Sequence, residues 1–142
     1  MELKDKMEYI KKCIEHLDML RKEYGAEKIV HSFLMLTSTL YTLQTAIQAL
    51  IDAGLRFLAE RGRKPPQQYS DIGKMLEEDG VFTEDDSTLF RRIVGFRNII
   101  VHRYLGIDMG LLKRIINEKL YRDIARLALK IIEEAEKRGI DP

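Results

Sequence analysis

The stretch AIQALIDAGLRFLAE, residues 46–60, belongs to a segment that would be apolar around most of its circumference if it formed a helix. Its apolar side chains recur at three- and four-residue steps, which is the spacing of one helical face. The main stripe consists of Ile29, Phe33, Leu36, Leu40, Leu43, Ile47, Leu50 and Leu58. Further apolar residues widen it: Val30, Leu34, Tyr41, Ala46 and Ile51. Such a helix is central to a fold or lies at an interface, and we predict it over residues 29–60.

The segments on either side of this helix are bounded by clear breaks. Residues 2–24 carry apolar side chains at helical spacing among Lys and Glu, and Gly25 closes that segment. After Glu60, the stretch RGRKPPQQY, residues 61–69, contains Gly62 and a Pro-Pro pair. These residues cannot continue a helix. The sequence therefore predicts a first helix over residues 2–24 and the end of the second near Glu60.

Helix-start and helix-stop residues mark the middle of the chain. Ser70 is the predicted N-cap of a short helix that ends near Gly80. Thr83, followed by three acidic residues, is the predicted start of another helix, because acidic side chains favour a helix N-terminus. Gly106 is the predicted end of that helix.

The last helical region is predicted to start at Asp108 and to reach about Lys137, with a break at Asn117. No strand pattern, internal repeat or domain linker occurs in the 142 residues. The predicted fold class is therefore all-α. We expect a single domain over residues 1–142, built as an antiparallel bundle of four main helices plus short helices.

Composition narrows the classes of function. The net charge is +1, so RNA or DNA binding would need a local basic patch. Cys13 is the single cysteine, which excludes a disulfide within the chain or a zinc site built from cysteines and suits a reducing cytoplasm. Charges throughout residues 1–17 argue against a signal peptide, and no run of about 18 uncharged apolar residues predicts a membrane span. We expect a cytoplasmic protein without a membrane partner.

The stretch RNIIVHRY, residues 97–104, places polar side chains among aliphatic ones on the predicted helix. At about 100° per residue, one arc holds Val94, Arg97, Asn98, Val101, His102, Tyr104 and Leu105. The opposite arc, predicted to pack on the core, holds Ile93, Phe96, Ile99 and Ile100. Aliphatic residues mixed with Arg and His are unusual on a solvent face. We therefore predict that the first arc meets a second protein surface, most simply in a symmetric dimer.

Each polar residue of the first arc has a chemical role that it could fill. Arg97 offers a charged planar fork that suits phosphate oxygens, and His102 can exchange a proton near neutral pH. Asn98 could orient the His102 imidazole or bind a phosphate oxygen. Tyr104 lies two turns beyond Arg97 and is expected to lean back toward it. Spacing alone is weak evidence, since a single helical His is more often structural and Tyr104 could simply pack.

Together with its neighbours, this motif resembles a known family. The stretch FRNIIVHRYLGID, residues 96–108, is similar to the R-x(4)-H-x-Y signature of the HEPN-domain toxins found in HEPN/MNT toxin–antitoxin pairs. Residues 46–82 are similar as well, from a long helix containing LID, through a Pro break, to a Y-x-D-I helix start. Gln48 departs from the family, many of whose members carry an acidic residue there.

The resemblance implies a HEPN-like fold and a metal-independent endoribonuclease that acts as a homodimer without a cofactor. The chemistry of such cleavage leads us to a hypothesis for the roles: Arg97 binds phosphate, His102 transfers protons and Asn98 orients the imidazole. The implied partner is an MNT-type nucleotidyltransferase antitoxin, which would transfer AMP onto Tyr104 and so silence the nuclease. The implied substrate is RNA, with tRNA as one target class.

Other interpretations stay open at this point. One is a non-catalytic helical dimer that binds a nucleotidyltransferase partner or a nucleotide. Another is a purely structural bundle, which leaves the polar arc unexplained. The basic cluster RGRK, residues 61–64, could hold an RNA backbone, but cations at a helix C-terminus explain it more simply. Asp85 and Asp86 are likewise explained by their place at a helix N-terminus.

Overall fold

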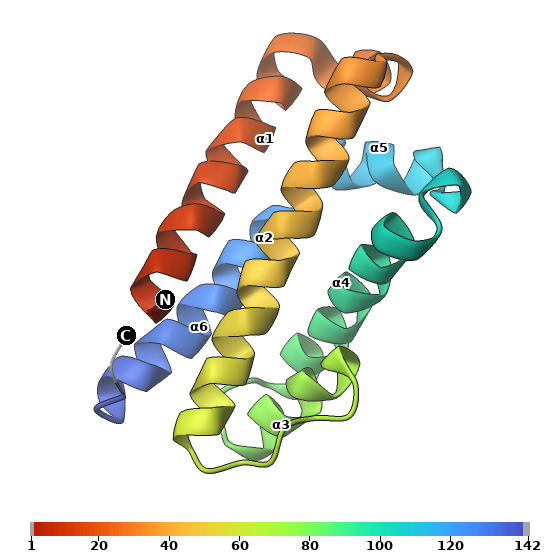
Figure 1. Ribbon diagram of the computed structural model, residues 1–142. Helices are drawn as coiled ribbons and strands as arrows, with labels where there is room; N and C mark the ends of the chain where they lie inside the picture. Colours follow the sequence, from red (N-terminus) through yellow and green to blue (C-terminus); the bar gives the residue numbers. More distant parts are fainter. Residues whose placement is uncertain (1, 141–142) are drawn as a thin grey trace.

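Helix α2 is central in the computed structural model, which describes residues 2–140 (Figure 1). It contacts α1 (Leu3–His31), α3 (Ile72–Glu78), α4 (Glu84–His102) and α6 (Arg122–Lys137), and itself spans Phe33–Glu60. The other elements are α5 (Met109–Asn117) and two 3₁₀ turns, η1 (Tyr69–Asp71) and η2 (Tyr104–Gly106). Residues 2–140 contain no strand, so the predicted all-α helical fold is confirmed.

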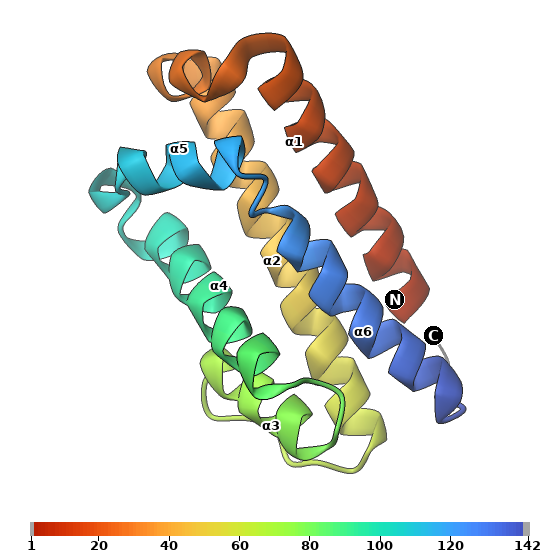
Figure 2. The ribbon, with the colours of Figure 1, turned by 180° about the vertical axis from the view of Figure 1, so that it is seen from behind.

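The helices are arranged so that α4 stands apart from α1 and contacts α6 only lightly. Figure 1 shows α1 and α2 side by side, with α6 crossing behind them and α4 on the other side of α2. Seen from behind in Figure 2, α6 runs along α1 and α2, and α5 lies across the end of α4. Helix α5 packs on α1, where Lys113 Nζ lies 3.1 Å from Glu27 Oε2. Helix α4 is therefore held mainly by α2 and α3.

The apolar stripe of α2 is buried in its second half and exposed in its first. Its buried members include Leu43, Ile47, Leu50 and Leu58, as predicted. Phe33 is 83% exposed, and Leu34 and Tyr41 are exposed as well. Phe33 lies outside the buried part of the stripe, because the first turns of α2 rise beyond the ends of α4 and α6 (Figure 1), and its exposure fits the interface that the sequence leaves open as an alternative. Among residues 2–140, α2 is the one helix that is long and apolar enough to cross a membrane. The core helix of a soluble protein can have the same length and composition.

The boundary between the first two helices lies later than predicted. Gly25 interrupts the helical geometry with φ 78° and ψ 158°, values that suit a residue without a Cβ. Helical turns then resume and run to His31, so that Ile29 belongs to α1 and not to α2. Ser32 caps α2, its side chain accepting a hydrogen bond from the N–H of Met35 at 3.2 Å.

The predicted cap of α4 is confirmed, whereas that of the preceding short helix is wrong. The Thr83 hydroxyl accepts from the N–H of Asp86 (3.1 Å), and the Asp86 carboxylate accepts from the N–H of Thr83 (3.1 Å). These two bonds form a capping box. Ser70 lies inside η1, and Gln68 caps that turn, with its N–H 3.3 Å from the Asp71 carboxylate.

Helix α4 ends at His102 and does not reach the predicted end at Gly106. Arg103 has φ −144° and ψ 48°, outside the helical region, and the next three residues form the turn η2. Tyr104 is therefore not in line with Arg97 on one helix. The predicted lean of its ring toward Arg97 does not follow from this geometry, because it assumed a continuous helix.

The predicted start of the last helical region and the break within it are confirmed. The Asp108 carboxylate accepts from the N–H groups of Gly110 (2.8 Å) and Leu111 (3.2 Å) and so caps α5. Helix α5 ends at Asn117, and Lys119 takes the left-handed conformation with φ 56°. The chain turns at this point before α6 begins.

The face of α4 that packs on the core differs in part from the predicted arc. Phe90, Val94 and Ile100 are buried, although the sequence predicts Val94 on the arc that faces a second protein. Members of the predicted core arc that are only half-buried are Ile93, Phe96 and Ile99. This shift arises because α4 packs on α2 and α3 and only lightly on α6. Ile93 and Phe96 instead line an apolar groove of about 490 Å³.

Asp86 ties the start of α4 to α6. Its buried carboxylate accepts hydrogen bonds from Arg126 Nη1 at 3.0 Å and from Lys130 Nζ. Burial by itself would raise the pKa of this carboxyl, but the hydrogen bonds from Lys130, Thr83 and Arg126 outweigh burial and hold the pKa well below its usual range. The ionised carboxylate therefore stabilises the folded chain.

Replacing Asp86 with asparagine tests this tie. We expect Asp86→Asn to lower the free energy of unfolding by about 2 kcal/mol at neutral pH, since two cations lose a buried partner. Because the pKa of Asp86 is depressed in the folded state, the variant should lose its full share of stability above about pH 4, the pKa of an unfolded-state aspartate. The difference in stability from wild type should shrink as the pH falls through the pKa of the folded state.

Urea unfolding of Asp86→Asn at neutral and at acid pH measures both effects. The exposed neighbour Asp85 supplies the control variant Asp85→Asn, which we expect to stay within about 0.5 kcal/mol of wild type. Full stability of Asp86→Asn at neutral pH, or a deficit that grows in acid, would contradict the role of this carboxylate.

Candidate active site

Arg97 lies half-buried on α4 and points toward α2 and η1. Its Nη2 donates to the side-chain oxygen of Gln48 on α2 at 2.7 Å. Its guanidinium carbon lies 5.7 Å from the centre of the Tyr69 ring in η1. Its Nη1 donates to the side-chain oxygen of the neighbouring Asn98 at 3.2 Å. Three elements of the fold therefore fix the position of one guanidinium.

The Tyr69 ring owes its place to the close packing of α3 on α4. Turn η1 contacts both α3 and α4. A Cβ at Gly73 of α3 would lie 3.0 Å from the carbonyl oxygen of Ser87, so glycine lets α3 and α4 approach this closely without displacing backbone. A cation over an aromatic face gains about 0.5–1 kcal/mol at a partly exposed site. The packing of α3 on α4 thus helps to place the uncharged ring of Tyr69 against Arg97.

Asn98 is exposed, and its side chain contacts Arg97. The sequence predicts that Asn98 orients the imidazole of His102 or binds a phosphate oxygen. The observed contact adds a different arrangement, in which Asn98 accepts from the guanidinium. The orientation of His102 by Asn98 stays a prediction.

His102 and Tyr104 lie at the exposed end of the motif. His102 is the last residue of α4 and is exposed. Tyr104 follows in η2 with 64% of its surface exposed, and Leu105 is 90% exposed. Val101, between Arg97 and this end, is half-buried. The motif therefore combines a guanidinium fixed against the protein with an imidazole and a phenol open to solvent.

The other two histidines make contacts away from the motif. His16 on α1 lies 2.8 Å from the hydroxyl of Ser38 on α2, measured from Nε2, and so links these two helices. His31 Nδ1 lies 2.8 Å from the carbonyl oxygen of Glu27, one turn earlier in α1. Neither of these hydrogen bonds connects its histidine to Arg97.

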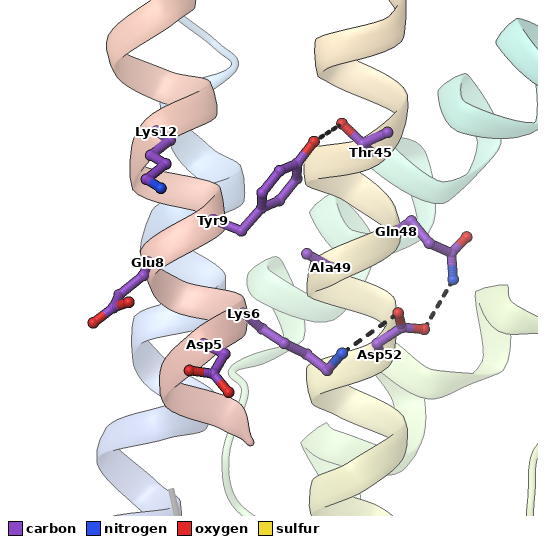
Figure 3. A pocket seen from close by; sticks show the side chains of 9 residues that line it. All are labelled: Asp5, Lys6, Glu8, Tyr9, Lys12, Thr45, Gln48, Ala49 and Asp52. Carbon is purple, nitrogen blue, oxygen red and sulfur yellow. Dashed lines mark hydrogen bonds and ion pairs between the residues drawn. The ribbon is translucent and has the colours of Figure 1, made fainter. Parts of the chain in front are cut away.

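A charged groove of about 510 Å³ runs between α1 and α2 on the other side of Gln48 (Figure 3). It is lined by Asp5, Lys6, Glu8, Tyr9, Lys12, Thr45, Gln48, Ala49 and Asp52. The Gln48 side-chain nitrogen donates to Asp52 at 2.9 Å, and Lys6 Nζ lies 3.7 Å from the other Asp52 oxygen. Gln48 therefore connects this groove with Arg97.

Sequence reasoning noted Gln48 only as a departure from a family pattern and missed Asp52 and Tyr69 as parts of the site. Gln48 and Asp52 are one helical turn apart, which is the one signal that links them. Arg97 lies 49 residues from Gln48, so spacing along the chain could not indicate their hydrogen bond. The same holds for Tyr69, which follows an irregular Pro-containing segment.

The basic cluster at residues 61–64 is in part structural. Arg63 pairs with Glu78 at 3.0 Å and with Asp79, and so joins the end of α2 to the end of α3. Arg61 and Lys64 are exposed. These ion pairs account for Arg63 as a structural residue, without any contact with RNA.

Comparison with known proteins finds a matching family model and several similar chains. The family model described as Ribonuclease HepT-like matches residues 10–131. A protein of Archaeoglobus fulgidus with a provisional RNase description is 26% identical over 129 residues, covering 89% of this chain and 96% of the relative. The mRNA nuclease HepT of Shewanella oneidensis is 25% identical over 117 residues, covering 82% and 86%.

The fold is shared with a solved structure as well. The tri-AMPylated HEPN toxin of Shewanella oneidensis, solved in complex with an MNT antitoxin, superimposes with a TM-score of 0.82 and 21% identity. The match covers 92% of this chain and 96% of the toxin chain. Because the family model spans most of its length, the chain belongs to the Ribonuclease HepT-like family.

Proposed function

We propose that this protein is a metal-independent endoribonuclease and the toxin of a HEPN/MNT toxin–antitoxin pair. Its family carries a ribonuclease description, and its relative in Shewanella oneidensis is named an mRNA nuclease. The observation that carries the proposal is the setting of Arg97, a half-buried guanidinium held by Gln48 and Tyr69. An exposed His102 follows on the same helix.

RNA cleavage without a metal ion uses the 2′-hydroxyl of the RNA as the nucleophile. Its oxygen bonds to the adjacent phosphorus while its proton passes to a general base. The bond from phosphorus to the 5′-oxygen breaks, and a general acid protonates that oxygen. A positioned cation stabilises the charge on the crowded phosphoryl oxygens. We assign that charge to Arg97 and the proton transfers to His102, with Asn98 orienting the guanidinium.

A composite site in a homodimer would provide both an acid and a base. The motif of one chain contains one histidine, whereas two α4 helices related by a two-fold axis would bring two copies of His102 and Arg97 to one cleft. Exposed apolar side chains support such a contact, at Leu105 beside the motif and at Phe33 and Leu34 at the start of α2. We propose a cytoplasmic homodimer whose substrates include mRNA or tRNA.

Removing either functional group should abolish cleavage without unfolding the chain. We expect Arg97→Ala and His102→Ala each to slow RNA cleavage in EDTA by at least about 100-fold, the usual cost of losing a charge stabiliser or a proton-transfer group. Matched controls are Arg114→Ala and His31→Ala, which remove the same side-chain types at exposed positions away from the motif.

Cleavage is followed on a labelled RNA, and size-exclusion chromatography checks the dimer. Wild-type rates in either motif variant would refute the assigned roles. A wild-type protein that forms the dimer but cleaves no RNA would favour the non-catalytic dimer that binds a nucleotidyltransferase or a nucleotide.

Tyr104 is the proposed site of silencing by an MNT-type nucleotidyltransferase. The Shewanella oneidensis toxin was solved in a tri-AMPylated form with its MNT antitoxin, and Tyr104 is accessible in the present structure. In the proposed step the Tyr104 oxygen bonds to the α-phosphorus of ATP, pyrophosphate leaves and the phenol loses its proton. AMP would then place a negative phosphodiester and an adenosine beside His102, where both would obstruct RNA.

Tyr104→Phe should separate silencing from cleavage. We expect wild-type protein, incubated with its nucleotidyltransferase and ATP, to gain AMP by mass spectrometry and to lose cleavage activity. Tyr104→Phe should still cleave RNA and should resist silencing, because it lacks the acceptor oxygen. Tyr41→Phe, at another exposed tyrosine, should be silenced like wild type. Silencing of Tyr104→Phe, or full activity of AMP-modified wild type, would refute this role.

A further inference from the structure

Gln48 makes contact with Arg97 on one side and with the charged groove on the other. Its Oε1 accepts from Arg97 Nη2 at 2.7 Å, and its Nε2 donates to Asp52 Oδ1 at 2.9 Å (Figure 3). A guanidinium can only donate hydrogen bonds, and a carboxylate can only accept them. The two partners therefore determine which way round the Gln48 amide lies.

The charges along this series of contacts follow a definite order. Lys6, whose side chain is only 14% exposed, pairs with Asp52 at 3.7 Å. Gln48 comes next and is neutral, and Arg97 follows. The one anion in the series is balanced by Lys6 and is separated from Arg97 by an amide. Arg97 is thus held in place without being neutralised.

The remaining contacts of Arg97 are neutral as well. They are the Asn98 amide oxygen and the Tyr69 ring. The Nε atom is buried and has no hydrogen-bond partner among the residues that the structure describes. Charged groups that leave water are ordinarily paired with an opposite charge. Within residues 2–140 this half-buried arginine is bound only by neutral groups, and it is therefore prepared for an anion from outside the chain.

We infer that Gln48 is a positioning residue, which aims Arg97 at a phosphate of the substrate while leaving its charge uncompensated. This inference rests on the proposed ribonuclease function and names what prepares its phosphate-binding cation. Asp52, balanced by Lys6, fixes Gln48 in turn. The acidic residue that many family members carry at position 48 would also hold Arg97, but in this chain, beside Asp52, it would form a charge-assisted pair that competes with phosphate. It would further set two carboxylates one turn apart on α2.

Exchanging the amide and the acid on α2 tests the order of charges directly. Gln48→Glu places a carboxylate against Arg97. The double variant Gln48→Glu/Asp52→Asn does the same but keeps the wild-type net charge and one amide–carboxylate pair. Gln44→Glu is the matched control, because it adds the same charge to α2 one turn before Gln48.

Binding is measured with a 2′-O-methylated RNA that cannot be cleaved, and cleavage with the same RNA unmodified. We expect Gln48→Glu and the double variant both to bind about tenfold more weakly and with a shallower dependence on salt, since one phosphate contact per chain is lost. Gln44→Glu should stay within about threefold of wild type. Thermal unfolding verifies that each full-length variant is folded.

A methionine at position 48 separates position from charge. Gln48→Met has a similar length but cannot hydrogen-bond to Arg97, so the guanidinium would stay charged and become mobile. We expect kcat to fall by about tenfold with a smaller change in KM. Misalignment of the cation should weaken its stabilisation of the transition state more than its binding of the ground state. In ¹⁵N NMR, the Nε–H signal of Arg97 should exchange with solvent faster than in wild type.

The outcomes distinguish this inference from the proposed function. Wild-type RNA affinity in Gln48→Glu, or recovery of affinity in the double variant, would overturn the importance of a neutral neighbour. An unchanged Arg97 signal in Gln48→Met would overturn the positioning role. A wild-type protein that binds the methylated RNA but does not cleave RNA would refute the nuclease alone. Absence of binding by the wild type would overturn the inference itself.

Discussion

Helix α2 has to bury apolar side chains along its second half, and the other helices are arranged to cover them. Helices α1, α3, α4 and α6 all contact it. Each fully buried aliphatic side chain of this size stabilises the fold by about 1.5–3 kcal/mol, so the stripe from Leu43 to Leu58 strongly favours this arrangement. Gln48 and Asp52 lie on the opposite, half-exposed face of the same turns. The helix that organises the core therefore also presents Gln48, which contacts Arg97, and Asp52, which holds Gln48.

The motif on α4 is divided by this packing into a fixed part and an open part. Arg97 is held against α2 and η1, whereas His102 and Tyr104 extend beyond the contacts that secure the helix. Asp86 anchors the opposite end of α4 to α6, whereas the part of the chain that the structure describes provides no such ion pair at the motif end. A positioned cation and an accessible imidazole on the same helix are the groups that the proposed site of a homodimer would use.

Local signals in the sequence predict much of the fold, and contacts between distant segments account for what they miss. Thr83 and Asp108 are caps recognisable from their own side chains, and both act as predicted. The end of α4 at His102 was missed because no residue type between His102 and Gly106 requires it. The bond between Gln48 and Arg97 joins helices whose relative placement depends on the whole core. The motif residues stand out by their mixture with aliphatic side chains on one arc, and the resemblance adds their roles, but neither signal holds information about the side chains that they contact.

In the proposed mechanism, Arg97 and His102 promote attack by the RNA's own 2′-hydroxyl. The chemical ends of the cleavage products report which nucleophile attacked. Mass spectrometry of a short RNA after a single turnover in EDTA should find a 2′,3′-cyclic phosphate on one fragment and a 5′-hydroxyl on the other. Fragments that end in a 3′-hydroxyl and a 5′-phosphate would show that water is the nucleophile, and would contradict the account.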